Sequence, residues 1–289
     1  MHEAKASHYG SEESMVIISI DPVAFSIGPL VIRWYGIMVA LAVIALLVVT
    51  FRETRKLSIS PDLVFSLFLW GIIGGFIGGR LVHIIDHWSY YVANPRELVG
   101  FAGLALYGSI FGTLVAVWIY MRVKKLRFGG LAGVGDAVAV GAPLAQALGR
   151  VGCTINGCCF GKPSPFNSFP GAVIYTPRDF VPYEYQGVPL YPAQIYFVIW
   201  NLIVFAILWQ LRSRLKPQGS LFFLYLCLYA AGDFGLRFFR YADTSYPGGL
   251  QQGQIISLAI LVVAVPWFII RMHAIARYKV SKQSHEQEE

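Results

Sequence analysis

Long apolar stretches alternate with short polar segments along most of the chain. An α-helix rises 1.5 Å per residue, so about 20 helical residues cross the hydrocarbon core of a membrane. Seven stretches carry little or no charge and approach that length, namely 34–51, 63–79, 98–121, 131–149, 194–211, 220–232 with an extension beyond, and 255–270. The pattern predicts an all-α membrane protein with seven transmembrane helices.

The segments around these stretches complete the predicted organisation. We expect a polar outer segment over 1–29, a transmembrane domain over 30–272 and a polar cytoplasmic tail over 273–289. The longest predicted non-helical segment, 160–192, holds seven of the fifteen prolines and several aromatic residues. Aromatic rings with polar edges are favoured at headgroup level. This outer cap is therefore either an aromatic belt or a lid that grips a substrate, and both interpretations stay open.

The composition agrees with a membrane protein. Of the 289 residues, 56% are hydrophobic and only 13% are charged, about half the charged fraction of an ordinary soluble domain. That balance excludes a disordered chain and argues against a soluble enzyme. The first fifteen residues lack the basic start and short apolar run of a cleaved signal peptide, so we expect the first membrane segment to be retained.

Lysine and arginine residues orient the predicted helices, because they are concentrated in cytoplasmic loops. Fourteen of the 23 follow the first, third, fifth and seventh stretches: Arg52, Arg55, Lys56, Arg122, Lys124, Lys125, Arg127, Arg212, Arg214, Lys216, Arg271, Arg277, Lys279 and Lys282. This distribution places the amino terminus outside and the carboxyl terminus in the cytoplasm. A basic fringe on anionic membrane lipid also explains the net charge of +7 without a nucleic-acid partner.

Four arginines do not fit the orientation rule. Arg80, Arg150, Arg237 and Arg240 lie at the predicted outer ends of helices. They are therefore candidates for binding or catalysis. Asp136 interrupts the fourth stretch, and we expect it to satisfy a neighbouring helix near the inner end.

The densest group of candidate residues follows the fourth stretch and reads GRVGCTINGCCFG over 149–161. Arg150 offers a planar donor fork that suits a phosphate, and Asn156 both donates and accepts hydrogen bonds. The alternative for Arg150 is simple snorkelling to the interface. The three cysteines have the spacing C-x4-C-C, which lacks the paired C-x2-C arrangement of common zinc sites. We therefore expect neither a metal nor another cofactor here, and a disulfide stays open.

Two helical patterns predict packing and pairing. Tyr229, Asp233, Arg237 and Arg240 are spaced four, four and three apart, so they share one helical face. Asp233 and Arg237 are placed to form an ion pair, which is either purely structural or part of a catalytic group. The second stretch contains GIIGGFIGGR, and glycines at this spacing favour close helix packing in lipid.

The segment GRVGCTINGCCFGKP resembles the arginine–glycine–asparagine signature of bacterial prolipoprotein diacylglyceryl transferases. Other segments follow in the same order as in that family: FSIGPLVIRWYG, GGRL, an aspartate fourteen residues before the signature arginine, YPAQIY and the face that begins with Tyr229. The resemblance covers roughly 21–243.

The resemblance implies a multi-pass protein of the bacterial cell membrane whose site is open to the outer leaflet. Members of the family move a diacylglyceryl group from phosphatidylglycerol to the lipobox cysteine thiol of a lipoprotein precursor and release glycerol phosphate. By resemblance, Arg150 would hold the phosphate. The other residues expected to bind substrate are Tyr35, Arg80, Asn156, Tyr229 and Arg240.

The chain departs from the family pattern in the residues that handle protons and charge. The family usually has histidine and two glycines where this chain has Tyr107, Gly108 and Ser109, and arginine and glutamate where it has Asp233 and Arg237. An ordinary tyrosine has a pKa of about 10 and is a poor base at neutral pH. Tyr107 therefore acts with a lowered pKa or positions lipid while Asp233 takes the proton. The alternative function is a phospholipid-binding relative without catalytic activity.

Overall fold

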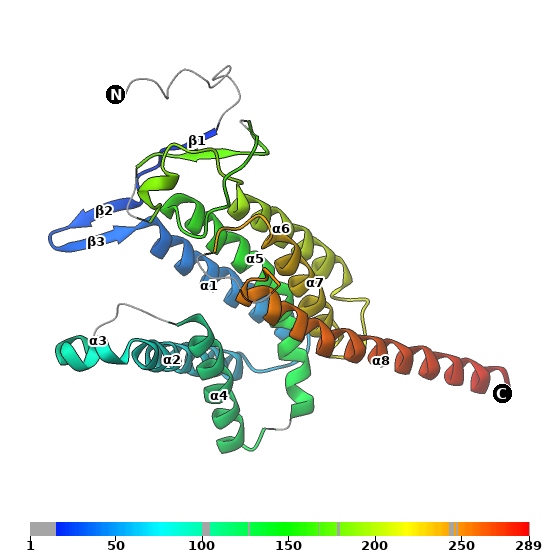
Figure 1. Ribbon diagram of the computed structural model, residues 1–289. Coiled ribbons are helices and arrows are strands. Elements are labelled where there is room, and N and C mark those ends of the chain that lie inside the picture. Colours follow the sequence, from blue (N-terminus) through cyan, green and yellow to red (C-terminus); the bar gives the residue numbers. More distant parts are fainter. Residues whose placement is uncertain are drawn as a thin grey trace, which may run out of the picture. The chain divides into compact units, whose positions relative to one another are not determined.

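The computed structural model describes residues 16–99, 105–126, 128–166, 168–177, 180–242, 246 and 248–288, and within these ranges the side chains at 99, 106–107, 128–131 and 273–288 are left out of the description. Most of this part of the chain is helical (Figure 1). The main helices are α1 (Trp34–Arg55), α2 (Pro61–Asp86), α4 (Leu106–Val123), α5 (Phe128–Asn156), α6 (Ala193–Leu211), α7 (Ser220–Leu236) and α8 (Gln252–Glu288). The chain divides into two compact units, one with residues 50–137 and the other with the remainder.

Five helices of the described chain are long and apolar enough to cross a membrane: α1, α2, α6, the Ala132–Asn156 part of α5 and the Gln252–Met272 part of α8. Two further apolar helices, Gly108–Val123 within α4 and Ser220–Leu236, are shorter. These helices support a membrane protein built mainly from α-helices. The predicted count of seven spans and the predicted orientation stay predictions.

Two boundaries differ from the sequence prediction. The third stretch was expected to be helical from 98, but Pro95–Val99 is a short 3-10 helix, η2, and α4 begins only at Leu106. Proline fixes its own backbone angle and lacks an amide donor, which favours a short turn at this position. At the other end of the chain, α8 continues through the predicted polar tail to Glu288.

The described part of this mostly helical protein also contains two short two-stranded sheets. Strand β1 (Val16–Ile18) pairs in parallel with β4 (Val173–Tyr175), and β2 (Val23–Ile27) forms an antiparallel hairpin with β3 (Leu30–Arg33). Gly28 has φ +58° in the hairpin turn, a backbone angle that glycine adopts without steric cost. Branched residues on either side of such a turn favour strand pairing over helix.

The predicted outer cap has a hydrophobic core of its own. Its buried side chains are Ile18, Phe160, Val173, Tyr175, Val181 and Leu190. Within the same segment, the rings of Phe166, Phe169, Phe180 and Tyr183 are exposed. The aromatic residues therefore divide into a core set, which holds β1 against β4, and a surface set.

Helices α6, α7 and α8 lie side by side in the larger unit (Figure 1). Their core includes the buried side chains of Val204, Leu208 and Leu221, together with Val49 of α1 and Val140 of α5. Branched aliphatic side chains on several helices interlock here as in other close-packed interiors. Val140 and Leu221 lie nearer the starts of α5 and α7 than the polar side chains of Arg150 and Asp233 do.

Glycines bring α2 and α4 into close backbone contact in the smaller unit. A Cβ atom at Gly78 would overlap the carbonyl oxygen of Gly108 and would lie 2.7 Å from the Cα atom of Gly112. The Thr113 hydroxyl donates a 2.9 Å hydrogen bond to the carbonyl oxygen of Gly71. The predicted packing role of these glycines is confirmed.

We predict that Gly78→Ala destabilises the protein by about 1–3 kcal/mol, because the added methyl group meets backbone that cannot rotate away. Gly36→Ala is the matched control, since the space around Gly36 is open and alanine favours helix. Thermal unfolding of the purified variants in detergent measures both effects. An equal melting temperature for the two variants would contradict close α2–α4 packing.

Candidate functional site

A small cavity of about 50 Å³ brings together several residues that the sequence singled out. It is lined by Arg150 from α5, by Tyr229 and Asp233 from α7, and by Gln146, Phe197, Trp200 and Asn201. Tyr229 and Asp233 are one helical turn apart, so their shared face is confirmed. The three residues converge although about 80 positions separate Arg150 from the other two.

Arg150 presents a cation to this cavity. Its guanidinium carbon lies 4.3 Å from the centre of the Phe197 ring, which supports the charge from one face. Within the described ranges, Arg150 forms no ion pair with a carboxylate. A guanidinium that lines a cavity and has no carboxylate partner among the described residues is suited to an anion.

Asp233 is only 3% exposed, and its two oxygens differ in their contacts. Oδ2 accepts a 2.6 Å hydrogen bond from Nε of Arg237 and a 2.8 Å hydrogen bond from the Ser257 hydroxyl. The predicted Asp233–Arg237 ion pair is thereby confirmed. Oδ1 has no hydrogen-bond partner among the described residues. The ion pair thus uses Oδ2, whereas Oδ1 is buried without a hydrogen bond from the described residues.

Polar side chains at the start of α8 hold the end of α7, and the sequence reasoning missed them. Gln251 donates hydrogen bonds of 2.9 and 2.8 Å to the carbonyl oxygens of Arg237 and Arg240. Gln254 donates to the carbonyl oxygen of Phe234, and both glutamines are buried. The signal was the polar run QQGQ ahead of an apolar helix, because buried amides need partners.

Trp200 forms another wall of the cavity and also escaped the sequence reasoning. Its indole nitrogen donates a 3.1 Å hydrogen bond to the carbonyl oxygen of Leu228. The ring lies so close to Gly232 that a Cβ atom there would overlap it. Gly232 is therefore required for the position of Trp200.

The chain reverses direction immediately after α5. Gly157 has φ +79° and Cys159 has φ +60°, the left-handed region that a side chain like that of cysteine rarely adopts. Backbone hydrogen bonds fix the reversed segment: Lys162 N donates to Phe239 O at 2.9 Å, and Tyr241 N donates to Phe160 O at 3.0 Å. The loop after α5 is thereby attached to the segment that follows α7.

This attachment places Arg240 beside a cluster of thiols. Nη2 of Arg240 lies 3.2 Å from Sγ of Cys159. The sulfur atoms of Cys153, Cys158 and Cys159 all lie within 4.8 Å of one another, and all three cysteines are free thiols. Hydrogen bonds from the other two thiols, together with the charges of Arg240 and Arg150, lower the pKa of the Cys159 thiol.

Two further predicted residues lie around the same end of α5. Asn156 is buried, its side chain interacts with Cys158, and its Oδ1 atom has no partner within the part of the chain that is described. Tyr35 of α1 is 42% exposed, and a Cβ atom at Gly152 would lie 3.4 Å from its ring. The signature segment therefore gathers Tyr35, Arg150 and Asn156 within one unit.

Three candidates belong to the smaller unit. Arg80 is buried, donates to the carbonyl oxygen of Glu97 and lies 5.1 Å from the centre of the Tyr91 ring, so its known contacts are local. Asp136 is buried in α5, as expected for a residue that satisfies its surroundings. Tyr107 is the second residue of α4, but its side chain lies outside the described part of the structure.

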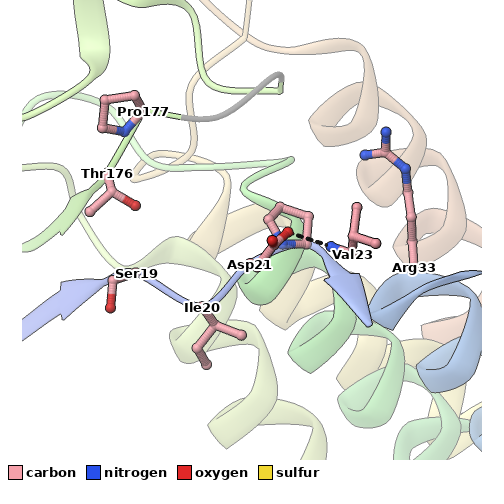
Figure 2. A pocket seen from close by; sticks show the side chains of 8 residues that line it. Ser19, Ile20, Asp21, Val23, Arg33, Thr176 and Pro177 are labelled. Atoms are coloured by element: carbon pink, nitrogen blue, oxygen red, sulfur yellow. Dashed lines mark hydrogen bonds between the residues drawn. The ribbon is translucent and has the colours of Figure 1, made fainter. Parts of the chain in front are cut away.

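A second, larger hollow of about 360 Å³ lies in the larger unit, between the segment that follows β1 and the segment that follows β4. Figure 2 shows its lining, from Ser19 and Asp21 after β1 to Arg33 at the end of β3 and Thr176 after β4. Oδ1 of Asp21 accepts a 2.8 Å hydrogen bond from the Val23 amide. None of the predicted site residues lines this hollow.

Known proteins resemble the chain over most of its length. A model of the prolipoprotein diacylglyceryl transferase family matches residues 22–270. The chain belongs to this family. A phosphatidylglycerol–prolipoprotein diacylglyceryl transferase from Dehalococcoides mccartyi is 42% identical over 259 residues, which cover 89% of this chain and 96% of the relative. Transferases of the same name from Clostridium tetani and Nostoc sp. are each 32% identical, over 85% and 89% of this chain and 96% and 93% of the relatives.

Membership in the transferase family confirms the resemblance found in the sequence. The matched range includes every residue of the 50 Å³ cavity and all three clustered cysteines. The chain is therefore similar to the family over most of its length, including the segments that form the cavity.

We predict that Gly232→Ala destabilises the protein by about 1–3 kcal/mol, because the methyl group displaces the Trp200 ring. Gly235→Ala is the control, since nothing lies within 4 Å of a Cβ atom there. In a Trp200→Phe background the cost of Gly232→Ala should shrink, which a double-mutant cycle of unfolding free energies measures. Additive effects of the two substitutions would refute the contact.

Proposed function

We propose that this protein transfers the diacylglyceryl group of phosphatidylglycerol to the lipobox cysteine thiol of lipoprotein precursors and releases glycerol phosphate. The names of its relatives and its family membership support the reaction. The observation that carries the assignment is that Arg150 and Asp233 line the same cavity. Among the described residues, Arg150 has no carboxylate partner, and Oδ1 of Asp233 has no hydrogen-bond partner.

Arg150 would bind the phosphate and stabilise the leaving group. In the reaction a sulfur–carbon bond forms, and the bond between the diacylglyceryl carbon and the phosphate oxygen breaks. The electron pair leaves with glycerol phosphate, which gains negative charge. A preorganised guanidinium is most effective at such a position when water is scarce. The ring of Phe197 and the buried surroundings provide that condition.

Asp233 would accept the proton of the incoming thiol through Oδ1. Arg237 and Ser257 bind the other oxygen and so hold the carboxyl group in position. Tyr107 would then position lipid rather than act as the base. We assign Tyr35, Asn156, Tyr229 and Arg240 to substrate binding, whereas the described contacts of Arg80 lie within the smaller unit.

The cavity must enlarge to admit a lipid headgroup. Its volume of about 50 Å³ holds one or two water molecules, since each takes about 30 Å³ in the liquid. Phe197 and Trp200 form its apolar walls, so a movement of these rings is the simplest way to open it. Substrate binding is thus expected to be coupled to a side-chain rearrangement.

The reaction fits a multi-pass protein of the bacterial cell membrane. We propose seven spans, with α4 and α7 as the two shorter ones, an outer amino terminus and a site that faces the outer leaflet. The basic residues after α1, α4, α6 and along α8 support this orientation. Residues 30–272 would then form the membrane domain, and 160–192 would form its outer cap.

We predict that Arg150→Ala lowers kcat/KM by about 10²–10³-fold, because one preorganised donor group to the leaving group is lost. Arg150→Lys should recover only part of the activity, since lysine lacks the planar fork. Arg122→Gln in the basic fringe after α4 is the control and should retain activity. Release of glycerol phosphate from phosphatidylglycerol and a lipobox peptide is the measurement.

The same assay tests the alternative function. A wild-type protein that binds phosphatidylglycerol through Arg150 but forms no thioether above background would overturn the proposed transfer. It would support a non-catalytic relative that binds phospholipid.

We predict that Asp233→Asn lowers kcat by about 10²–10⁴-fold, the usual contribution of a proton acceptor, with less change in phosphatidylglycerol binding. Ser257→Ala should be much milder, because it removes one hydrogen bond to Oδ2 and leaves Oδ1 in place. Single-turnover rates and lipid binding in matched nanodiscs separate the two effects. Equal losses for the two variants would show that Asp233 acts only through structure.

A further inference from the structure

Three thiols converge at the end of α5, next to the cavity that holds Arg150. We propose that Cys153, Cys158 and Cys159 bind a Zn²⁺ ion whose fourth coordination position takes the cysteine sulfur of the lipoprotein precursor. The inference rests on the proposed function, because it identifies how that reaction obtains its thiolate. It departs from the sequence expectation of a site without metal.

The distances suit a tetrahedral thiolate site. Zinc–sulfur bonds of about 2.3 Å at tetrahedral angles place sulfur atoms about 3.8 Å apart. The three sulfur atoms lie within 4.8 Å of one another before any ion is considered. Each cysteine is partly buried and free. Sulfur ligands select zinc and other soft metals over magnesium or calcium.

The backbone conformation explains how three cysteines with the spacing C-x4-C-C come together in one cluster. Cys153 is in the last turn of α5, and the reversal at Gly157 and Cys159 brings the following two cysteines back to it. Gln194 donates a 3.0 Å hydrogen bond to the carbonyl oxygen of Cys158 and fixes the turn. The left-handed backbone of Cys159 is a strained feature of the kind that persists when a site requires it.

The charges around the cluster also favour this ion. Three thiolates and one Zn²⁺ leave one net negative charge, which is costly in a buried place unless it is compensated. Arg240 supplies a guanidinium nitrogen 3.2 Å from Sγ of Cys159. A disulfide would use only two of the three sulfurs and would give Arg240 no anion to stabilise.

Three protein ligands leave one position open, which is the arrangement of catalytic rather than structural zinc sites. A free cysteine has a pKa of about 8.5 and is mostly protonated at neutral pH. Coordination to zinc deprotonates a thiol outright. The precursor thiol would release its proton to Asp233 on binding, and the resulting thiolate would attack the diacylglyceryl carbon. The carbon–oxygen bond breaks, and its electron pair leaves with glycerol phosphate, so no oxidant or reductant is needed.

Cobalt substitution tests the site directly. The purified full-length protein in detergent is stripped of metal with a chelator and titrated with Co²⁺. We expect sulfur-to-cobalt charge-transfer absorption that saturates at one equivalent per chain. Cys158→Ser should abolish this absorption, whereas Cys227→Ser in α7, outside the cluster, should leave it unchanged. No saturating signal in the wild type, or a disulfide within the cluster found by mass spectrometry, would overturn the proposal.

The d–d absorption bands of the Co²⁺ protein test separately whether the fourth coordination position binds the precursor thiol. A lipobox peptide should shift the d–d bands of the Co²⁺ protein, and the same peptide with serine in place of cysteine should not. Cobalt d–d bands that shift with neither peptide would overturn the proposed role for the precursor thiol. This measurement requires no turnover, so it stands even if the wild-type protein is inactive.

Turnover separates this inference from the proposed function. Removal of metal should lower product formation by about 10²-fold or more, and Zn²⁺ should restore it, with phosphatidylglycerol binding unchanged. Full activity of the metal-free protein would refute the zinc site and leave the transferase assignment intact. No product from the zinc-loaded wild type would refute the transferase assignment, while the cobalt spectra would still report on the site.

Discussion

A carboxylate buried among membrane helices is costly unless its neighbours neutralise it, and the larger unit is organised around Asp233. Arg237 pairs with one oxygen of this side chain at the end of α7, and the Ser257 hydroxyl of α8 donates a hydrogen bond to the same oxygen, so that α7 and α8 are joined by a buried polar contact as well as by packing. Gln251 extends the connection to the carbonyl oxygens of Arg237 and Arg240. The end of α7 is thereby held in one place, and the segment after it in turn holds the loop that follows α5.

The second requirement is small residues wherever large or charged groups approach the backbone. Gly232 makes room for the Trp200 ring, Gly253 for the Arg237 guanidinium and Gly161 for the backbone of Tyr191. These contacts let bulky and charged groups gather around a cavity of only about 50 Å³. Such a site is prepared for a charged headgroup in its electrostatics, but its walls must move before the headgroup enters.

Local patterns in the sequence predicted local features well. Apolar stretches indicated most helices, spacing of four indicated the Asp233–Arg237 pair, and glycine spacing indicated the α2–α4 contact. The structural features that the sequence did not predict depend on contacts between residues that are distant in the chain. The pairing of β1 with β4 joins segments more than 150 residues apart, and Gln251 and Trp200 acquire roles only through neighbouring helices. The clustering of the three thiols depends on the left-handed backbone at Gly157 and Cys159, about which the linear spacing of the cysteines contains no information.

The roles of arginines near helix ends likewise depend on contacts that the sequence pattern does not reveal. Arg80 and Arg150 looked alike in the sequence, as arginines that topology did not explain. In the structure, Arg80 donates to a backbone carbonyl in its own unit, whereas Arg150 lines a cavity with Asp233. Only the contacts in the folded protein distinguish an arginine that donates to backbone carbonyl oxygens from one that lines a cavity where an anion can bind.

The central claim is that Arg150 receives the phosphate of phosphatidylglycerol. The most direct measurement is an electron cryo-microscopy structure of the protein in nanodiscs that contain this lipid. We expect headgroup density in an enlarged cavity beside Phe197 and Trp200, with the phosphate about 2.7–2.9 Å from the Arg150 guanidinium nitrogens. A phosphate bound elsewhere, for example in the hollow between Asp21 and Arg33, with Arg150 still unoccupied, would contradict it.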